Sequence, residues 1–178
     1  QKWDLHKRIA LFVLENVGSN GASLVLGFMV TAALISMWVM NTATTIMLLP
    51  IGLAVITVVK ETVKGLSEEE TENFQLSLLL GIAYGATIGG MSTLIGTGPN
   101  GMLAAFMSDN YNLDISFVDW MKVGVPLSAV MLPSSWLILT RVIYPVKFET
   151  SQETTDLLTT MKQELGSFDG PEVKVFFV

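Results

Sequence analysis

The chain has 178 residues, of which 51% are hydrophobic and 15% charged, with a mean hydropathy of +0.55 and a net charge of −6. Soluble domains carry about 25% charged residues, so this composition favours a membrane protein. The absence of cysteine excludes disulfides, thiolate metal sites and cysteine nucleophiles. Nothing in the charge pattern indicates nucleic-acid binding, because the acidic excess comes mostly from two short segments, residues 61–72 and 149–172.

No residue between Glu15 and Lys60 is charged, and this run has 44 residues. It is far longer than the roughly 18 apolar residues that mark one membrane span. The polar cluster at residues 41–45, Asn-Thr-Ala-Thr-Thr, interrupts the run near its middle. Asn and Thr side chains at membrane depth have no water to bond, so they are costly unless they line a cavity or bind a ligand. The cluster is therefore the main indication of function.

The uncharged run predicts either two full spans or a re-entrant hairpin that enters and leaves on one side. With the turn at residues 38–42, each arm has about 16 residues and measures ~24 Å at 1.5 Å per residue. This length is short of a hydrocarbon core about 30 Å thick. We therefore expect a re-entrant helical hairpin over residues 20–59, with the Asn-Thr cluster at its tip.

The next apolar block predicts a broken transmembrane helix over residues 74–107. Residues 89–101 contain five glycines and a proline, which are the strongest helix breakers, and we expect the helix to unwind around residues 96–100. The alternative is an ordinary external loop between two spans. The 15 residues before Gly89 are too few for a complete span, and this favours the broken helix.

Two short patterns predict where helices begin. Ser67 with Glu70 forms a capping box, and Ser116 with Asp119 resembles one. The helix that follows Ser116 contains two prolines and should be kinked. Trp120, near its start, occupies the place of an interfacial aromatic residue.

The basic residues predict the orientation in the membrane. Eight of the ten lie in residues 1–8, 60–73 and 141–162, whereas residues 108–117 contain two aspartates and no Lys or Arg. The positive-inside rule places the first three segments in the cytoplasm and the last one outside. The chain begins at Gln1 and stops within an apolar run, so we expect a piece of a longer protein. The expected order is the end of a helix and a connector (1–19), the hairpin (20–59), a cytoplasmic connector (60–73), the broken helix (74–107), an external loop (108–116), a transmembrane helix (117–147), a cytoplasmic amphipathic helix (148–170) and the start of another membrane segment (171–178).

The two polar breaks, residues 36–45 and 89–100, lie in neighbouring membrane segments. Broken helices expose carbonyls, which suit Na⁺, and N–H groups, which suit a carboxylate or sulfate. Neither break contains an acid or a base, so a bound cation must neutralise the anion. The physical interpretation is an anion that binds beside sodium. In the alternative, the Asn and Thr side chains only tie the hairpin arms together.

An enzyme is the competing class, and the sequence does not support it. Ser36, Thr42 and Thr44 supply hydroxyls, but no base lies near them in the apolar blocks. Residues 96–100 lack the lysine and the strand–loop–helix context of a phosphate loop. We therefore expect no catalytic residues and no enzymatic activity.

Two motifs carry a resemblance to a known family. Residues 36–45, SMWVMNTATT, with the following Leu48-Leu49-Pro50-Ile51, resemble the first Ser-Asn-Thr signature of the divalent anion/sodium symporter (DASS) family. This family includes the sodium-coupled dicarboxylate and citrate cotransporters. Residues 93–100, TLIGTGPN, are similar to its second hallmark, the unwound loop of the following helix. The resemblance extends over essentially the whole chain.

The resemblance implies an all-α membrane protein, in which the re-entrant hairpin and the broken helix form one half of an inverted-repeat transporter. The second repeat is missing from this chain, so transport by the chain alone is not expected. It further implies a multi-pass protein of the plasma or inner membrane and a homodimer. The implied function is sodium-coupled symport of di- and tricarboxylates of the succinate, malate and citrate class, by an elevator-like movement. The alternatives are a sodium-independent dicarboxylate or sulfate exchanger and a non-transporting membrane fragment.

The resemblance also assigns roles to individual residues. Sodium would be held by the side chains of Ser36 and Asn41 and by the backbone carbonyl of Gly96. Asn41, Thr42 and Thr97 would hold a substrate carboxylate, with Gly98 allowing close approach of the backbone. Met40 stands where the family has its signature serine, so only its backbone oxygen remains for sodium.

Overall fold

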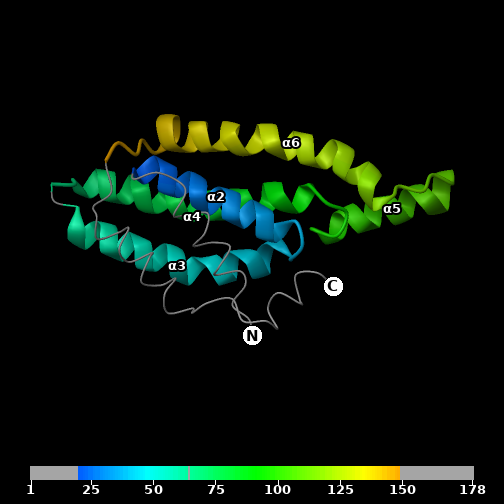
Figure 1. Cartoon of the computed structure of the whole chain (residues 1–178), viewed down its shortest axis with the longest axis horizontal. Coiled ribbons are helices and arrows are strands. Elements are labelled where there is room, and N and C mark those ends of the chain that lie inside the picture. The colour runs from blue at the N-terminus through cyan, green and yellow to red at the C-terminus, as the bar shows by residue number, and fades with distance from the viewer. Residues whose placement is uncertain (1–19, 64, 149–178) are drawn as a thin grey trace, which may run out of the picture.

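The computed structural model describes residues 20–63 and 65–148, and this part of the chain is an elongated bundle of helices (Figure 1). The expected all-α class is confirmed. The segments expected at residues 1–19 and 171–178, and all but the first residue of the amphipathic helix expected at 148–170, lie outside the described residues. The elements are α2 (Gly21–Ser36), α3 (Asn41–Thr62), α4 (Glu68–Met91), α5 (Gly98–Tyr111), α6 (Phe117–Leu137) and the π-helix η1 (Ile138–Ile143).

The helices α2 and α3 form a hairpin with unequal arms. The prediction of two arms of about 16 residues is correct for α2, which has 16, and wrong for α3, which has 22 and measures ~33 Å at 1.5 Å per residue. The helix α3 continues beyond the apolar block, where the ammonium of Lys60 donates to Gln75 Oε1 of α4 at 3.0 Å. The turn covers residues 37–40, so Asn41 and Thr42 begin α3 instead of forming the turn.

Three helices of the described part are long and apolar enough to cross a membrane, namely Asn41–Glu61, Glu68–Met91 and Phe117–Ile143. The helix α2 is apolar but has only 16 residues. The re-entrant character of the hairpin stays a prediction, because length and composition alone do not fix the depth of its tip.

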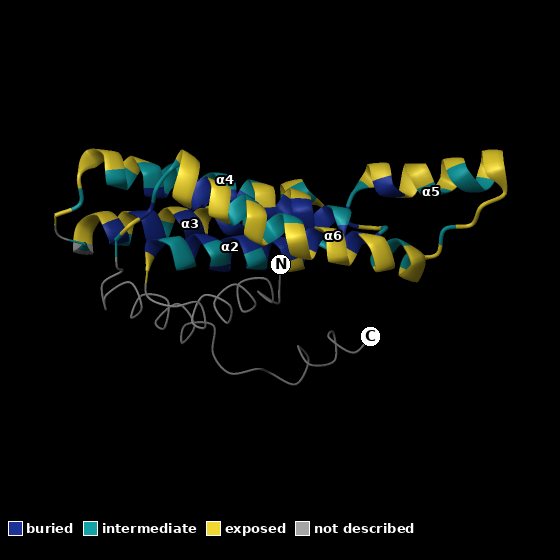
Figure 2. Cartoon of the chain, turned by 90° about the horizontal axis from the view of Figure 1, so that it is seen from above, coloured by how far each residue is buried: buried dark blue, intermediate teal, exposed yellow. Residues whose placement is uncertain are grey.

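The closest packing in the bundle is between α2 and α4, and it depends on glycines. Gly81, Gly85 and Gly89 follow one another at four-residue spacing, so they line one face of α4. A Cβ on Gly85 would lie 2.5 Å from the carbonyl oxygen of Met29, and one on Gly89 would clash with the backbone of Ala33. Small residues at this spacing let two membrane helices approach closely. Figure 2 shows buried residues on α2, α3 and α4, where these helices pack together, and mostly exposed ones on α5 and α6.

A non-helical segment, residues 92–97, separates α4 from α5. The observed break begins four residues and ends three residues before the predicted one at 96–100, and the two overlap at residues 96 and 97. Gly98 and Pro99 already belong to the first turn of α5, where proline is tolerated because its missing N–H needs no helical partner. The helix α5 continues to Tyr111 and ends at Asn112, whose left-handed backbone (φ 50°) closes it. The expected external loop therefore shrinks to residues 112–116.

The helix α6 returns along the bundle and is fixed to α2 and α4 by side-chain hydrogen bonds. At its start, the Ser116 hydroxyl caps α6 by accepting from the Asp119 N–H at 3.2 Å. The other predicted helix start is that of α4, where Ser67 and Glu70 form the capping box. Both predicted helix starts are thereby confirmed. At the far end, Trp136 Nε1 donates to the Ala22 carbonyl of α2 at 2.8 Å.

Candidate functional site

The tip of the hairpin lies against the break between α4 and α5 (Figure 1). The link is a hydrogen bond in which the buried Thr93 hydroxyl, in the break, donates to the Met37 carbonyl in the tip at 2.5 Å. The helix α5 continues past the tip, so the tip stands beside the middle of the α4–α5 pair rather than at its end. The two polar breaks predicted from the sequence thus meet at one place.

Ser36 and Asn41 join the two arms of the hairpin. Ser36 is fully buried at the end of α2, and its hydroxyl donates to Asn41 Oδ1 at 2.6 Å. Because Asn41 is the first residue of α3, this bond connects one helix end to the next across the turn. Each oxygen keeps lone pairs after the bond is made, so both remain possible ligands for a cation.

Gly90, near the end of α4, is the contact point for three predicted site residues. A Cβ on Gly90 would clash with Asn41 Oδ1 and would lie 2.8 Å from Thr97 Cγ2. A Cβ on Gly96 would in turn clash with the Gly90 carbonyl. The structure therefore brings Asn41, Gly96 and Thr97 together around Gly90, with Ser36 attached through Asn41.

The other predicted residues lie at the edge of this cluster. Thr42 and Gly98 are exposed in the first turns of α3 and α5, and a Cβ on Gly98 would meet nothing within 4 Å. Met40 is 67% exposed, and its side chain does not cap α3. Among the described residues, no hydrogen bond connects Met40, Thr42 or Gly98 to the cluster around Gly90.

Four helix ends converge at the cluster, and this sets its electrostatics. The C-terminal ends of α2 and α4 present carbonyls, and the N-terminal ends of α3 and α5 present N–H groups. Neither α3 nor α5 has a side-chain cap. The first N–H groups of α3 and that of Gly98 in α5 remain available to an anion. Pro99 has no N–H, and that of Asn100 donates to the Thr97 carbonyl at 3.2 Å. Within the described ranges, no group of three or more His, Asp or Glu residues could hold a metal ion, so any cation here would be held by neutral oxygens.

Sequence reasoning named no role for three residues that build the cluster, Gly90, Thr93 and Asn100. All three are buried, and Asn100 donates from Nδ2 to the carbonyls of Gly90 at 3.0 Å and Thr93 at 2.7 Å. Thr93 and Asn100 lie inside the second motif, residues 93–100, so the sequence did mark them as part of a motif. Their contacts, however, depend on how the break folds back on α4, and no local pattern reveals that.

The helix α6 also supports the break. Trp120 Nε1 donates to the Met91 carbonyl at 3.0 Å, and the Ser92 and Ser128 hydroxyls are joined at 2.7 Å. Ser128 in turn donates to the Ile88 carbonyl at 2.9 Å. Trp120, predicted as an interfacial residue, thus has a protein partner, and side chains of α6 hold the last turn of α4.

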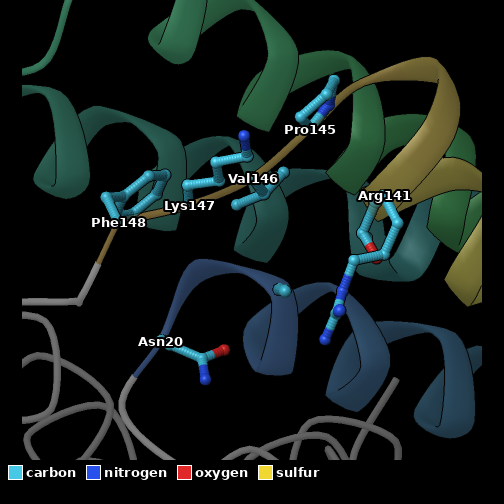
Figure 3. A pocket seen from close by; sticks show the side chains of 8 residues that line it. Asn20, Arg141, Pro145, Val146, Lys147 and Phe148 are labelled. Carbon is cyan, nitrogen blue, oxygen red and sulfur yellow. The ribbon is translucent and has the colours of Figure 1, made fainter.

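A cavity of about 360 Å³ lies at the other end of α2 and is separate from the cluster (Figure 3). Arg141 and Lys147 both line it, but Figure 3 shows their charged ends pointing in different directions. Two cations that do not converge make a poor anion site. The cavity therefore adds nothing to the site at the tip. Its lining residues are Asn20, Ala22, Thr140, Arg141, Pro145, Val146, Lys147 and Phe148.

Comparison with known proteins identifies the family. The family model described as citrate transporter (CitMHS) matches residues 1–164. The chain is 35% identical over 179 residues to the sodium-dependent dicarboxylate transporter SdcS of Staphylococcus saprophyticus, covering 100% of this chain and 34% of that protein. It is also 35% identical over 181 residues to the SdcS of Staphylococcus aureus strain USA300, covering 100% of this chain and 35% of the relative. The chain thus spans about a third of the length of the curated relatives it matches.

These findings confirm the resemblance to the DASS family, and the matching family and both relatives are named as transporters. Together with the three helices that could cross a membrane, they show an integral membrane protein of the plasma membrane. The chain belongs to the citrate transporter family.

Proposed function

We propose that the protein containing this chain is a secondary active transporter that couples the movement of di- and tricarboxylates to sodium. The relatives are named as sodium-dependent dicarboxylate transporters. The observation that carries the proposal is the convergence of two uncapped helix N-termini, the Ser36–Asn41 pair and the Gly96 backbone around Gly90. This arrangement offers oxygens to a cation and N–H groups to an anion at neighbouring positions.

In this proposal sodium binds at the end of α2. Its ligands are Ser36 Oγ, Asn41 Oδ1 and the Gly96 carbonyl. The first two are neighbours, joined by a hydrogen bond of 2.6 Å, and each oxygen keeps a lone pair for a cation. The Met40 carbonyl, which accepts from the Thr44 N–H at 3.0 Å, has a second lone pair for the same ion.

The substrate carboxylate binds at the start of α3 and α5. The hydroxyls of Thr42 and Thr97 and the amide of Asn41 donate to it. The first N–H groups of α3 and the Gly98 N–H of α5 donate as well. Gly98 has no side chain to keep the carboxylate away from the backbone. A carboxylate at a helix N-terminus is stabilised by these N–H groups and by the helix dipole.

Coupling follows from charge. The named ligands are all neutral, so a carboxylate that leaves water for this site without sodium would be a poorly compensated charge. A sodium ion bound beside it supplies the missing countercharge, and at short range in a low dielectric this attraction is strong. Sodium therefore raises the affinity for the carboxylate, and by linkage the carboxylate raises the affinity for sodium.

The rest of the site belongs to parts of the protein beyond this chain. A second, inverted copy of the hairpin and broken helix would bind the other end of the dicarboxylate. We further propose that the protein acts as a homodimer and that the hairpin domain moves as a unit across the membrane. The family resemblance supports both statements.

The proposal is tested by uptake of radiolabelled succinate into proteoliposomes that contain the intact protein, with and without an inward sodium gradient. We expect uptake that requires sodium and is lost in Asn41→Ala. Thr57→Ala is the matched control, because Thr57 lies exposed on the same helix and its hydroxyl bonds only to the Leu53 carbonyl of that helix. Equal uptake in sodium and potassium would contradict the coupling.

A sodium-independent exchanger is the second candidate, and Met40 is the observation that favours it. The exposed thioether of Met40 replaces a hydroxyl that could bind sodium. Two measurements of succinate uptake distinguish the two candidate functions, one on the Met40→Ser variant and one in sodium-free buffer. A symporter should need less sodium for half-maximal uptake in Met40→Ser, whereas an exchanger should take up succinate without sodium when the vesicles contain unlabelled succinate.

A further inference from the structure

Thr93 connects the hairpin tip directly to the loop that carries Gly96. Its side chain is fully buried, and its hydroxyl donates to the Met37 carbonyl of the tip while it accepts from the Gly96 N–H at 3.0 Å. One oxygen atom thus fixes the position of the Gly96 backbone relative to the turn that follows Ser36. Nothing else in the described part of the chain bonds the tip to this loop.

Asn100 closes the loop from the other side. It is 9% exposed, and both bonds of its Nδ2 go to backbone carbonyls, one on Gly90 in α4 and one on Thr93 in the break. The amide therefore connects the last turn of α4, the break and the first turn of α5. A buried amide with both donor hydrogens satisfied holds backbone more rigidly than packing alone.

These bonds decide which carbonyls of the break stay available. The carbonyls of Gly90 and Thr93 are occupied by Asn100. Among the hydrogen bonds of the described residues, none reaches the carbonyls of Leu94, Ile95 or Gly96. The Ser92 carbonyl accepts none of these bonds either, but it lies against Gly124 of α6. The free carbonyls that are not packed against α6 are therefore those of residues 94–96, which include Gly96, a proposed sodium ligand.

We propose that Thr93 and Asn100 are positioning residues for sodium: they hold the Gly96 carbonyl at a fixed place relative to the Ser36–Asn41 pair and so set the affinity for the ion. The inference rests on the proposed function and adds two residues to it. Neither side chain is itself a ligand, so both act through the backbone. Their loss weakens sodium binding without preventing transport at high sodium.

The variants separate the hydroxyl of Thr93 from its shape. Thr93→Val keeps the volume and removes the bonds to Met37 and Gly96, whereas Thr93→Ser keeps the oxygen. Thr87→Val is the matched control, because Thr87 lies on α4 with an exposed side chain that bonds only to the Ala83 carbonyl of its own helix. Asn100→Ala frees the Gly90 and Thr93 carbonyls and provides a second test if Thr93→Val does not fold.

The experiment measures, on the intact protein, the sodium concentration for half-maximal succinate uptake and the rise in melting temperature that sodium alone produces. Loss of one or two buried hydrogen bonds predicts that Thr93→Val and Asn100→Ala need roughly tenfold more sodium. The maximal rate at saturating sodium should stay close to that of the parent. Sodium should raise the melting temperature of both variants less, while Thr93→Ser and Thr87→Val should behave like the parent.

An unchanged sodium requirement in folded Thr93→Val or Asn100→Ala would overturn the inference while leaving the proposed function intact. A lowered yield or melting temperature with the parental sodium requirement would also overturn it, because it would show a purely structural role. A parent protein that takes up succinate without sodium would instead contradict the proposed function itself.

Discussion

At the scale of single residues, the site depends on the absence of a side chain at Gly90. The Asn41 amide and the Thr97 methyl group both occupy the space next to its Cα. Any Cβ there would have to displace Asn41, which is bonded to Ser36. Interiors packed this tightly respond to even one added methyl group.

The first prediction concerns this contact. Gly90→Ala should abolish succinate uptake by the intact protein, because the new methyl group pushes the Asn41 amide away from Ser36. Gly101→Ala is the matched control, since a Cβ on Gly101 meets nothing within 4 Å, and it should transport normally. Normal uptake by Gly90→Ala would show that Asn41 does not need its present position.

The sequence allowed some of these residues to be predicted and not others. Ser36, Asn41, Gly96 and Thr97 belong to motifs whose chemistry is local, namely polar groups at helix breaks. Gly90 could not be singled out among neighbouring glycines, because its role arises from the approach of another helix end. The roles of Ser36, Asn41 and the other motif residues as ligands stay predictions until binding is measured.

At the scale of elements, glycines set the distance between α2 and α4. The series Gly81, Gly85 and Gly89 brings α4 against the backbone of α2, and the same helix pair carries Ser36 and Gly90 at its far end. A substitution that changes this packing should therefore lower the stability of the bundle and also alter the geometry of the site.

The second prediction compares two positions in this series. A Cβ on Gly85 lies 2.5 Å from a backbone oxygen, whereas one on Gly81 lies 3.1 Å from the side-chain atoms of Val25 and Met29, which can move. Gly85→Ala should cost about 1–3 kcal/mol of stability by overpacking, and Gly81→Ala should cost less. The melting temperatures of the purified intact variants check this, and equal values would contradict the role of close backbone contact.

Element boundaries show where local patterns were misleading. Both helix starts were predicted correctly because a cap joins residues three apart in sequence. Ser67 and Glu70 form a full capping box, whereas at Ser116 only the side chain accepts from the Asp119 N–H. The break was predicted to begin four residues and to end three residues too late, because Pro99 was interpreted as a helix breaker, whereas proline in the first turn begins a helix. The length of α3 was underestimated because Lys60 ended the apolar run but not the helix, which α4 supports through Gln75.

At the scale of the whole molecule, charge distribution and helix order should define an orientation. The connector between α3 and α4 and the end of η1 carry basic residues, whereas the loop at residues 112–116 has none. The helices α5 and α6 also expose many large apolar side chains, as lipid or further protein segments would require. Positive charge on one side indicates that this side faces the cytoplasm.

The third prediction tests this orientation by cysteine labelling, for which a chain without native cysteine is well suited. In the intact protein with any other cysteines removed, Asn112→Cys should react with a membrane-impermeant maleimide added to whole cells. Glu69→Cys lies at the start of α4, which is the other end of the α4–α5 pair from Asn112. It should react only after the membrane is opened. Both positions are exposed in the structure. The reverse pattern would invert the topology.

The central claim is that the hairpin tip and the break form one site in which sodium and a dicarboxylate bind together. Calorimetric titration of succinate into the purified intact protein, in sodium and then in potassium, tests it most directly. We expect binding in sodium, at least tenfold weaker binding in potassium, and no binding in Asn41→Ala, while Thr57→Ala binds normally. Equal affinity in both salts, or unchanged binding in Asn41→Ala, would contradict it.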